Sequence, residues 1–141
     1  MPRINFFSED VAFRLKNKRQ IIKWIHQTAA QEGKAIEEVS YIFCSDEYLR
    51  QINVDYLNHD YLTDIITFDN SDQSDKIEGD IFISVDRVKE NALNFDSTWQ
   101  KELFRVIIHG ILHLIGYKDK TREEELLMRE KEDYYLNQLA I

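Results

Sequence analysis

The sequence predicts a single α+β domain over residues 1–141, with a mixed four-stranded sheet packed against about five helices. Two observations support this fold class. Up to residue 57, short β-rich runs alternate with amphipathic helical patterns, and beyond it a pair of neighbouring β-rich runs precedes helical patterns only. The length of 141 residues and the hydrophobic content of 43% also fit one domain with a substantial core.

The first four elements alternate between strand and helix. Residues 3–7 are rich in β-favouring side chains, and residues 16–34 place apolar side chains at helical spacing before a closing glycine. Residues 39–44 form a short apolar run that is typical of a buried strand. Residues 45–57 then place apolar side chains on one helical face behind Ser45, a favoured N-cap residue.

Two neighbouring strands are predicted next, from β-branched and aromatic runs at residues 63–68 and 79–85. The polar segment between them, residues 69–78, is expected to be a mobile loop. Its aspartates could suggest a calcium site, but their spacing is not that of an EF-hand loop. We therefore interpret the segment as a solvated connection.

Three helices complete the predicted fold. Asp86 is expected to cap a helix that runs through Asn94, Ser97 to cap a longer helix, and Thr121 to begin a last helix rich in Glu, Leu and Tyr. The longer helix contains two histidines in an apolar run, which is the pattern of the zinc helix in metalloproteases. The predicted order is therefore strand, helix, strand, helix, strand, strand and three helices.

Charge and cysteine content limit the classes of function. The net charge is −8, from 26 acidic and 18 basic residues, so any RNA binding would need a local basic patch. Cys44 is the single cysteine, which excludes an internal disulfide and fits a reducing, cytoplasmic setting. The first residues show no leader pattern and the chain has no long apolar run, so neither export nor membrane insertion is expected.

The segment HGILHLIGYKDK, residues 109–120, carries the strongest functional signal. His109 and His113 are four residues apart, so on a helix both imidazoles can face one ion. Gly116 can end the helix and turn the chain back, which offers Asp119 as a third ligand at the spacing of metzincin-type sites. The alternative is that both histidines are core residues bonded to backbone carbonyls. We expect one divalent metal ion at His109, His113 and Asp119, with a fourth position open for water.

Two departures from zinc peptidases affect the expected chemistry. The peptidase motif HExxH carries its general base directly after the first histidine, where this chain has Gly110, and this difference disfavours a peptidase. A carboxylate at Asp119 in place of a third imidazole lowers the charge of the site. Zn²⁺ is then the most favoured ion, with Ni²⁺, Mn²⁺ and Fe²⁺ as alternatives.

Three segments are similar, in the same order, to motifs of one known family. HGILHLIGYKD at residues 109–119 resembles the motif HGxLHLxGYDH, NVDYLNHDYLTDIITF at residues 53–68 resembles NxxYRxxDxxTDVLSF, and EGDIFIS at residues 78–84 resembles LGDIxIS. On these residues the chain resembles the YbeY endoribonucleases over about residues 38–120. It departs from them at Asp119, where the family has a third metal histidine, and at Leu57, where the family has an arginine.

The resemblance implies a metal-dependent, single-strand-specific endoribonuclease that acts in ribosomal RNA maturation, including 16S rRNA 3′ end processing, and in ribosome quality control. The implied setting is the cytoplasm. The implied partners are ribosomal RNA in the small-subunit precursor, with a ribosomal protein or a ribosome-associated GTPase. The ion would act as a Lewis acid on a phosphodiester oxygen and lower the pKa of its water.

The matched segments and their neighbours supply candidates for the other roles. Asp64 and Asp80, each at the edge of a predicted strand, are candidate general bases, although aspartates at such positions more often cap or hold a turn. Arg105, four residues before His109, is a candidate catalytic cation. The candidate substrate-binding residues are His59, Lys118 and Lys120.

Two other functions stay open. The first is a non-catalytic ribosome-assembly factor that keeps the metal for structure, which the acidic charge and Leu57 favour. The second is a zinc hydrolase of another substrate, peptides included, because a fold does not settle a substrate. Lys118 and Lys120 could be solvated surface charges that do not bind substrate. Three aromatic residues could stack on RNA bases, or could instead belong to the core. These aromatic residues are Tyr56, Tyr61 and Phe68.

Overall fold

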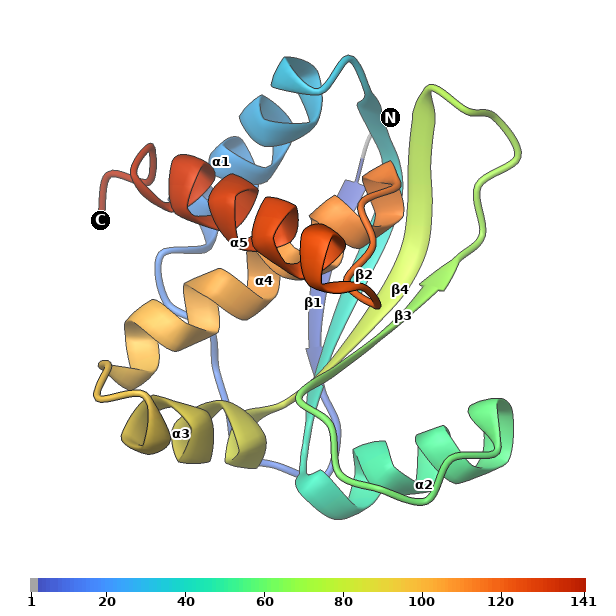
Figure 1. Cartoon of the computed structure of the whole chain (residues 1–141), viewed down its shortest axis with the longest axis vertical. Helices are drawn as coiled ribbons and strands as arrows, with labels where there is room; N and C mark the ends of the chain where they lie inside the picture. Colours follow the sequence, from blue (N-terminus) through green and yellow to red (C-terminus); the bar gives the residue numbers. More distant parts are fainter. Residues whose placement is uncertain (1–2) are drawn as a thin grey trace.

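The computed structural model describes residues 3–141, and its elements follow the predicted order (Figure 1). Within these residues the chain forms a single-domain α+β fold with four strands and five helices. None of the helices within this range is long and apolar enough to cross a membrane. The strands are β1 (Arg3–Ser8), β2 (Ala35–Cys44), β3 (Ile65–Asp69) and β4 (Lys76–Ser84). The helices are α1 (Lys18–Gln31), α2 (Asp46–Leu57), α3 (Val85–Asn94), α4 (Trp99–Ile115) and α5 (Arg122–Leu136).

The strands form one mixed sheet in the order β1, β2, β4, β3. β1, β2 and β4 are parallel, and β3 pairs antiparallel with β4 at the edge. Pairing between β2 and β4 begins at Ala35 and Lys76, so both strands start earlier than predicted. Glu38 and Glu78 pair directly there, because ladder hydrogen bonds use the backbone and tolerate polar side chains at a solvated end of the sheet. The predicted loop is thereby shortened to residues 70–75.

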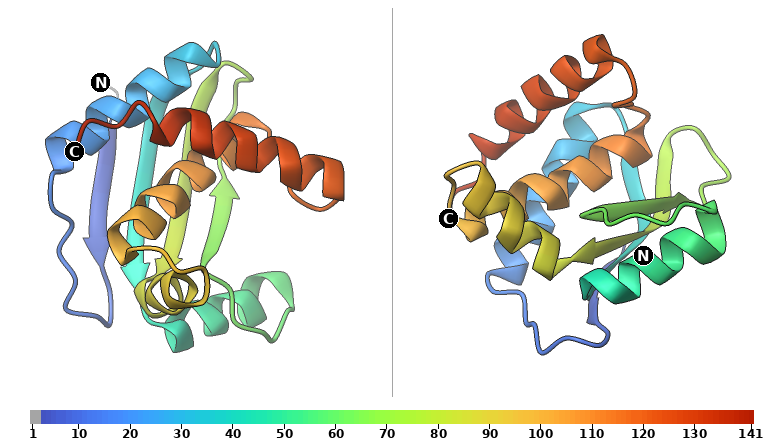
Figure 2. Two further views of the ribbon diagram at one scale, coloured as in Figure 1. Left: turned by 60° about the vertical axis from the view of Figure 1, so that its left-hand side comes forward. Right: turned by 60° about the horizontal axis from the view of Figure 1, so that its bottom comes forward.

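Helices α1, α4 and α5 lie on one side of the sheet, whereas α2 lies on the other (Figure 2). The main hydrophobic core fills the space between the sheet and α4, where Ile81 and Ile83 of β4 are fully buried. The buried Tyr41 hydroxyl of β2 donates a hydrogen bond to the Ile107 carbonyl of α4 at 2.9 Å. A smaller cluster under α2 contains Cys44, Leu49 and Ile66. Because side chains alternate along a strand, each position of β3 and β4 faces either α4 or α2.

Two of the predicted N-caps are confirmed. The Ser45 hydroxyl accepts a hydrogen bond from the Tyr48 N–H at 3.1 Å at the start of α2. At the start of α5, the Thr121 hydroxyl accepts from the Glu124 N–H at 3.1 Å, and the Glu124 carboxylate accepts from the Thr121 N–H at 3.0 Å. This reciprocal capping box fixes the point at which the chain enters α5.

The other two predicted N-caps are wrong by one or two residues. Helix α3 begins after Ser84, whose hydroxyl accepts a helix N–H, and Asp86 accepts the N–H of Asp46 in α2 at 3.0 Å. Helix α4 begins after Thr98, and not after Ser97. In both places the sequence offers two capping residues close together, and the tertiary contacts of the preceding segment decide between them.

Candidate metal centre

The C-terminal half of α4 and the turn after it carry the three predicted metal ligands. His109 and His113 lie one helical turn apart, with ring centroids separated by 4.5 Å. Helix α4 ends at Gly116, whose φ of 127° is a conformation that L side chains rarely adopt, as predicted for a helix terminator. The Gly116 N–H still bonds to the Leu112 carbonyl at 3.1 Å, and the chain then turns so that Asp119 returns to the two histidines.

The turn between α4 and α5 is held by contacts from α1. The Tyr117 hydroxyl donates a hydrogen bond to the carboxylate of Glu32, the C-cap residue of α1, at 2.7 Å. Lys131 of α5 approaches the same carboxylate at 3.3 Å. Elements far apart in the sequence therefore fix the segment that carries Asp119.

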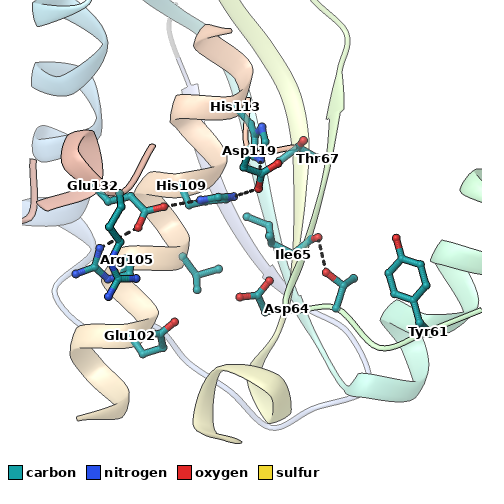
Figure 3. Close-up of a pocket in the computed structure, with 13 residues that line it drawn as sticks. Tyr61, Asp64, Ile65, Thr67, Glu102, Arg105, His109, His113, Asp119 and Glu132 are labelled. Atoms are coloured by element: carbon teal, nitrogen blue, oxygen red, sulfur yellow. Dashed lines mark hydrogen bonds and ion pairs between the residues drawn. The ribbon is translucent and has the colours of Figure 1, made fainter. Parts of the chain in front are cut away.

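The three candidate ligand atoms converge on one point (Figure 3). The Asp119 carboxylate lies 3.4 Å from Nε2 of His109 and 3.3 Å from Nε2 of His113. All three ligand atoms lie within 4.8 Å of one another. Two imidazole nitrogens and one carboxylate oxygen form a donor set that suits zinc and neighbouring divalent metals, so the residues present fit a bound ion.

Glu132 of α5 contacts the other nitrogen of His109 and was not predicted from the sequence. Its carboxylate lies 2.6 Å from Nδ1 of His109 and accepts a hydrogen bond from Arg105 at 2.9 Å (Figure 3). Glu132 is only 5% exposed, so these two partners compensate a buried charge. Arg105 also donates to Asp133 at 2.7 Å. The one signal in the sequence was that Glu132 follows Met128 by four residues, on the buried face of α5.

Neighbouring carboxylates determine the protonation of the metal-free site. Burial alone would lower the pKa of His109, but hydrogen bonds to Asp119 and Glu132 raise that pKa to about 9. The hydrogen bond from His109 in turn holds the pKa of Asp119 at about 2. Burial and the charge of His109 lower the pKa of His113. A proton therefore resides on His109 in the metal-free site, and an ion that binds there displaces it.

Gly110 allows α4 to pack closely on the sheet beneath the site. A β-carbon added at Gly110 would lie 2.9 Å from two side-chain carbons of Ile81 and 3.1 Å from Ile65. This position is where HExxH peptidases carry a glutamate. The space that a glutamate would need is occupied by the core, so this helix cannot supply a general base at that position.

The three ligands line one side of a polar cavity of about 500 Å³, and Asp64 lines it from the start of β3. Asp64 is half-buried and receives a hydrogen bond from the Asn91 side chain at 3.4 Å. Burial raises the pKa of this carboxyl group. Tyr61 and Glu102 also line this cavity, from opposite sides (Figure 3). The structure thus brings Asp64 and Arg105 together with the three candidate metal ligands.

Other predicted residues lie outside this cavity. Asp80 is on the α2 side of β4, where it lines a separate hollow and receives a hydrogen bond from Asn70 at 3.4 Å. Its neighbours along β4, and not Asp80 itself, face α4, so Asp80 lies apart from the three candidate ligands. His59 is exposed and stacks on Tyr61, with ring centroids 5.2 Å apart. The remaining two candidates, Lys118 and Lys120, are exposed and do not line the cavity.

Comparisons with known proteins agree with the motifs. Residues 3–140 match the family model described as Endoribonuclease YbeY. Two similar proteins are named Endoribonuclease YbeY. The one from Cytophaga hutchinsonii is 57% identical over 95% of this chain and 94% of its own length. The one from Porphyromonas gingivalis is 48% identical over 94% of this chain and 87% of its own length. The solution structure of TM1509 from Thermotoga maritima is also similar, with a TM-score of 0.67 and 29% identity over 97% of this chain and 89% of that one. The family model and the relatives show that this chain belongs to the endoribonuclease YbeY family.

Proposed function

We propose that this protein is a metal-dependent, single-strand-specific endoribonuclease that acts in ribosomal RNA maturation, including 16S rRNA 3′ end processing, and in ribosome quality control. Membership of the endoribonuclease YbeY family supports the RNA-cleaving activity. The observation that carries the proposal in this chain is the convergence of His109, His113 and Asp119 beside Asp64 in one open, polar cavity. The partners are the small-subunit precursor and a ribosomal protein or ribosome-associated GTPase, in the cytoplasm.

His109, His113 and Asp119 hold one divalent ion in this proposal. Zn²⁺ is the most favoured ion for two imidazoles and a carboxylate, and Ni²⁺, Mn²⁺ and Fe²⁺ are the alternatives. When bound, the ion supplies a Lewis acid that polarises a phosphodiester oxygen and lowers the pKa of water. Glu132 accepts the Nδ1 proton of His109 and so leaves Nε2 free to face the ligand position.

Asp64 is the proposed general base. It lies in the cavity with the three ligands, whereas the other candidate base faces the opposite side of the sheet. A carboxylate whose pKa is raised by burial accepts a proton more readily than an exposed one. The proton that Asp64 accepts comes from the attacking group, which is either water or the RNA's own 2′-hydroxyl.

Tyr61 offers a basis for single-strand preference. Its ring is 55% exposed at the wall of the cavity and stacks on His59. A base can stack on such an aromatic surface only when it is not already stacked within a helix. Tyr61 therefore favours unpaired RNA at the site.

A second candidate function is a ribosome-assembly factor that binds the metal without turnover. Two observations favour it. Leu57, at the position of the family's arginine, carries no charge and is 43% exposed. Arg105, the candidate replacement, is already engaged by two carboxylates. Under this function the protein would associate with small-subunit precursors and leave RNA intact.

Metal analysis combined with an RNA cleavage assay separates the two functions. Metal content is measured by elemental analysis in the wild type, His113→Ala and Asp119→Ala, with His26→Ala of α1 as a matched control. Each protein is then incubated with a single-stranded ribosomal RNA fragment and with the same sequence in a duplex. We expect one ion and single-strand cleavage in the wild type and the control, and neither in the two ligand variants. A bound ion without cleavage would favour the assembly factor, and cleavage that persists in both ligand variants would refute the metal site.

A further inference from the structure

The cavity at the metal centre contains two arginines, which differ in how they are engaged. Its lining has four carboxylates against these two guanidinium groups, so one divalent ion brings the formal charge of the lining to zero. An RNA phosphate that enters such a site needs a cation that is not already neutralised by a carboxylate. The carboxylates are Asp64, Glu102, Asp119 and Glu132, and the guanidinium groups are those of Arg105 and Arg129.

Arg105 is fully engaged within the protein. One of its terminal nitrogens donates to Glu132 at 2.9 Å and the other to Asp133 at 2.7 Å. Its side chain is only 11% exposed. Binding a phosphate would require Arg105 to leave Glu132, which is buried and has His109 as its other partner. Arg105 therefore orders the metal centre and is poorly suited to bind substrate.

Arg129 differs from Arg105 in its exposure and in its lack of carboxylate partners within residues 3–141. It lies three residues before Glu132 on α5, so both side chains occupy neighbouring positions on the helix face that borders the cavity. Arg129 is exposed, and within residues 3–141 no carboxylate lies within 4.0 Å of its guanidinium group and no side-chain hydrogen bond engages it. Its charge nevertheless acts on the cavity, because it opposes the rise in the pKa of Glu102 that burial and Asp64 cause.

We propose that Arg129 is a substrate-binding residue that holds a backbone phosphate of single-stranded RNA beside the metal centre. This inference rests on the proposed endoribonuclease function and extends it to a residue outside the three matched motifs. The guanidinium group presents a planar fork of N–H donors that matches two phosphate oxygens. The substrate-binding candidates predicted from the sequence, His59, Lys118 and Lys120, do not line the cavity, whereas Arg129 does.

The test compares variants that change one charge at different places. Zinc-loaded wild type, Arg129→Gln and Arg129→Lys are titrated against a fluorescein-labelled single-stranded RNA with 2′-O-methyl sugars, which prevent attack by the 2′-hydroxyl. Arg19→Gln is the matched control, because Arg19 is exposed on α1 and lies outside the cavity. Fluorescence anisotropy gives the affinity over a series of salt concentrations, and metal content and melting temperature are recorded for each variant.

Arg129→Gln is expected to weaken binding about tenfold, and to reduce the slope of log affinity against log salt by about 0.7, the value for one phosphate contact on a single strand. Arg129→Lys should keep the slope, and Arg19→Gln should keep both slope and affinity. On cleavable RNA, Arg129→Gln should raise KM with kcat unchanged. A slope in Arg129→Gln equal to that of Arg19→Gln overturns the assignment, with or without a fall in metal content or melting temperature. Wild-type protein that neither binds nor cleaves single-stranded RNA overturns the proposed function and this assignment together.

Discussion

Replacing Glu132 by glutamine removes the negative charge beside Nδ1 of the candidate metal ligand His109. The carboxylate is 5% exposed, lies 2.6 Å from Nδ1 of His109 and accepts from Arg105 at 2.9 Å. Glutamine keeps the shape and one acceptor oxygen, but its amide nitrogen is a donor and cannot serve both partners. The variant therefore leaves either the His109 ring or the Arg105 guanidinium group without its buried acceptor.

The size of the effect follows from the two contacts. Loss of a carboxylate that orients a metal-binding histidine raises the metal Kd about 10- to 100-fold, which is about 1.4–2.7 kcal/mol. The metal-free protein also loses stability, because one of the two buried partners of Glu132, His109 or Arg105, is left without its acceptor. We expect this second cost to be about 2–3 kcal/mol.

Competition with a chromophoric zinc chelator measures the first effect, and urea unfolding of the metal-free protein measures the second. Asp133→Asn is the matched control, because Asp133 also binds Arg105 but is 55% exposed and does not contact His109. It should cost at most about 1 kcal/mol of stability and leave the metal Kd unchanged. Wild-type metal affinity in Glu132→Gln, or an equal loss in Asp133→Asn, would refute the role assigned to Glu132.

Three further predictions concern the site and its support. Metal-free protein should lose up to about 3 kcal/mol of stability between pH 6.5 and 9. The pKa of His109 is raised to about 9 in the folded protein, so the stability that its protonation contributes is complete below the unfolded pKa and is lost as pH rises through 9. Urea unfolding at both pH values should show this loss in the wild type and not in His109→Asn. Asp119→His should bind Zn²⁺ at least as tightly as the wild type, because an imidazole at this position is also a zinc ligand, and loss of the ion on elemental analysis would show that the turn cannot place the larger ring. Gly110→Ala should destabilise the protein by about 1 kcal/mol, since overpacking against Ile81 outweighs the gain in helix propensity; a rise in melting temperature would contradict the close packing of α4.

Local patterns in the sequence were sufficient for the order of the elements and for the convergence of the three candidate metal ligands. The spacing of His109 and His113 and the turn at Gly116 are properties of one short segment, so the convergence on Asp119 could be predicted. The contact of Glu132 with His109 could not be predicted, because the two residues are 23 positions apart in the sequence and meet only where α5 crosses α4. A buried glutamate on a helix indicates a partner without identifying it.

Asp64 and Asp80 illustrate a different limit. Both stand at strand edges in matched motifs, and the alternation of a strand separates its two faces without saying which face meets the metal helix. The packing of α4 on β3 and β4 settles the question, with Asp64 in the cavity and Asp80 beyond the sheet. The exact N-caps of α3 and α4 were missed for a related reason, since neighbouring capping residues are locally equivalent.

The close approach at Gly110 also constrains how this scaffold can change. In HExxH enzymes one helix carries both the ion's ligands and the proton acceptor, so the two move together. Here the helix supplies two candidate ligands, while Asp64, the proposed acceptor, stands on the strand side of the cavity. Conversion to a peptidase-type site by Gly110→Glu would first force α4 away from Ile65 and Ile81 and so disrupt the core. Under the proposed mechanism, catalytic alignment depends on the fit between a helix and an edge strand, and substitutions in that interface would change activity without replacing a candidate ligand.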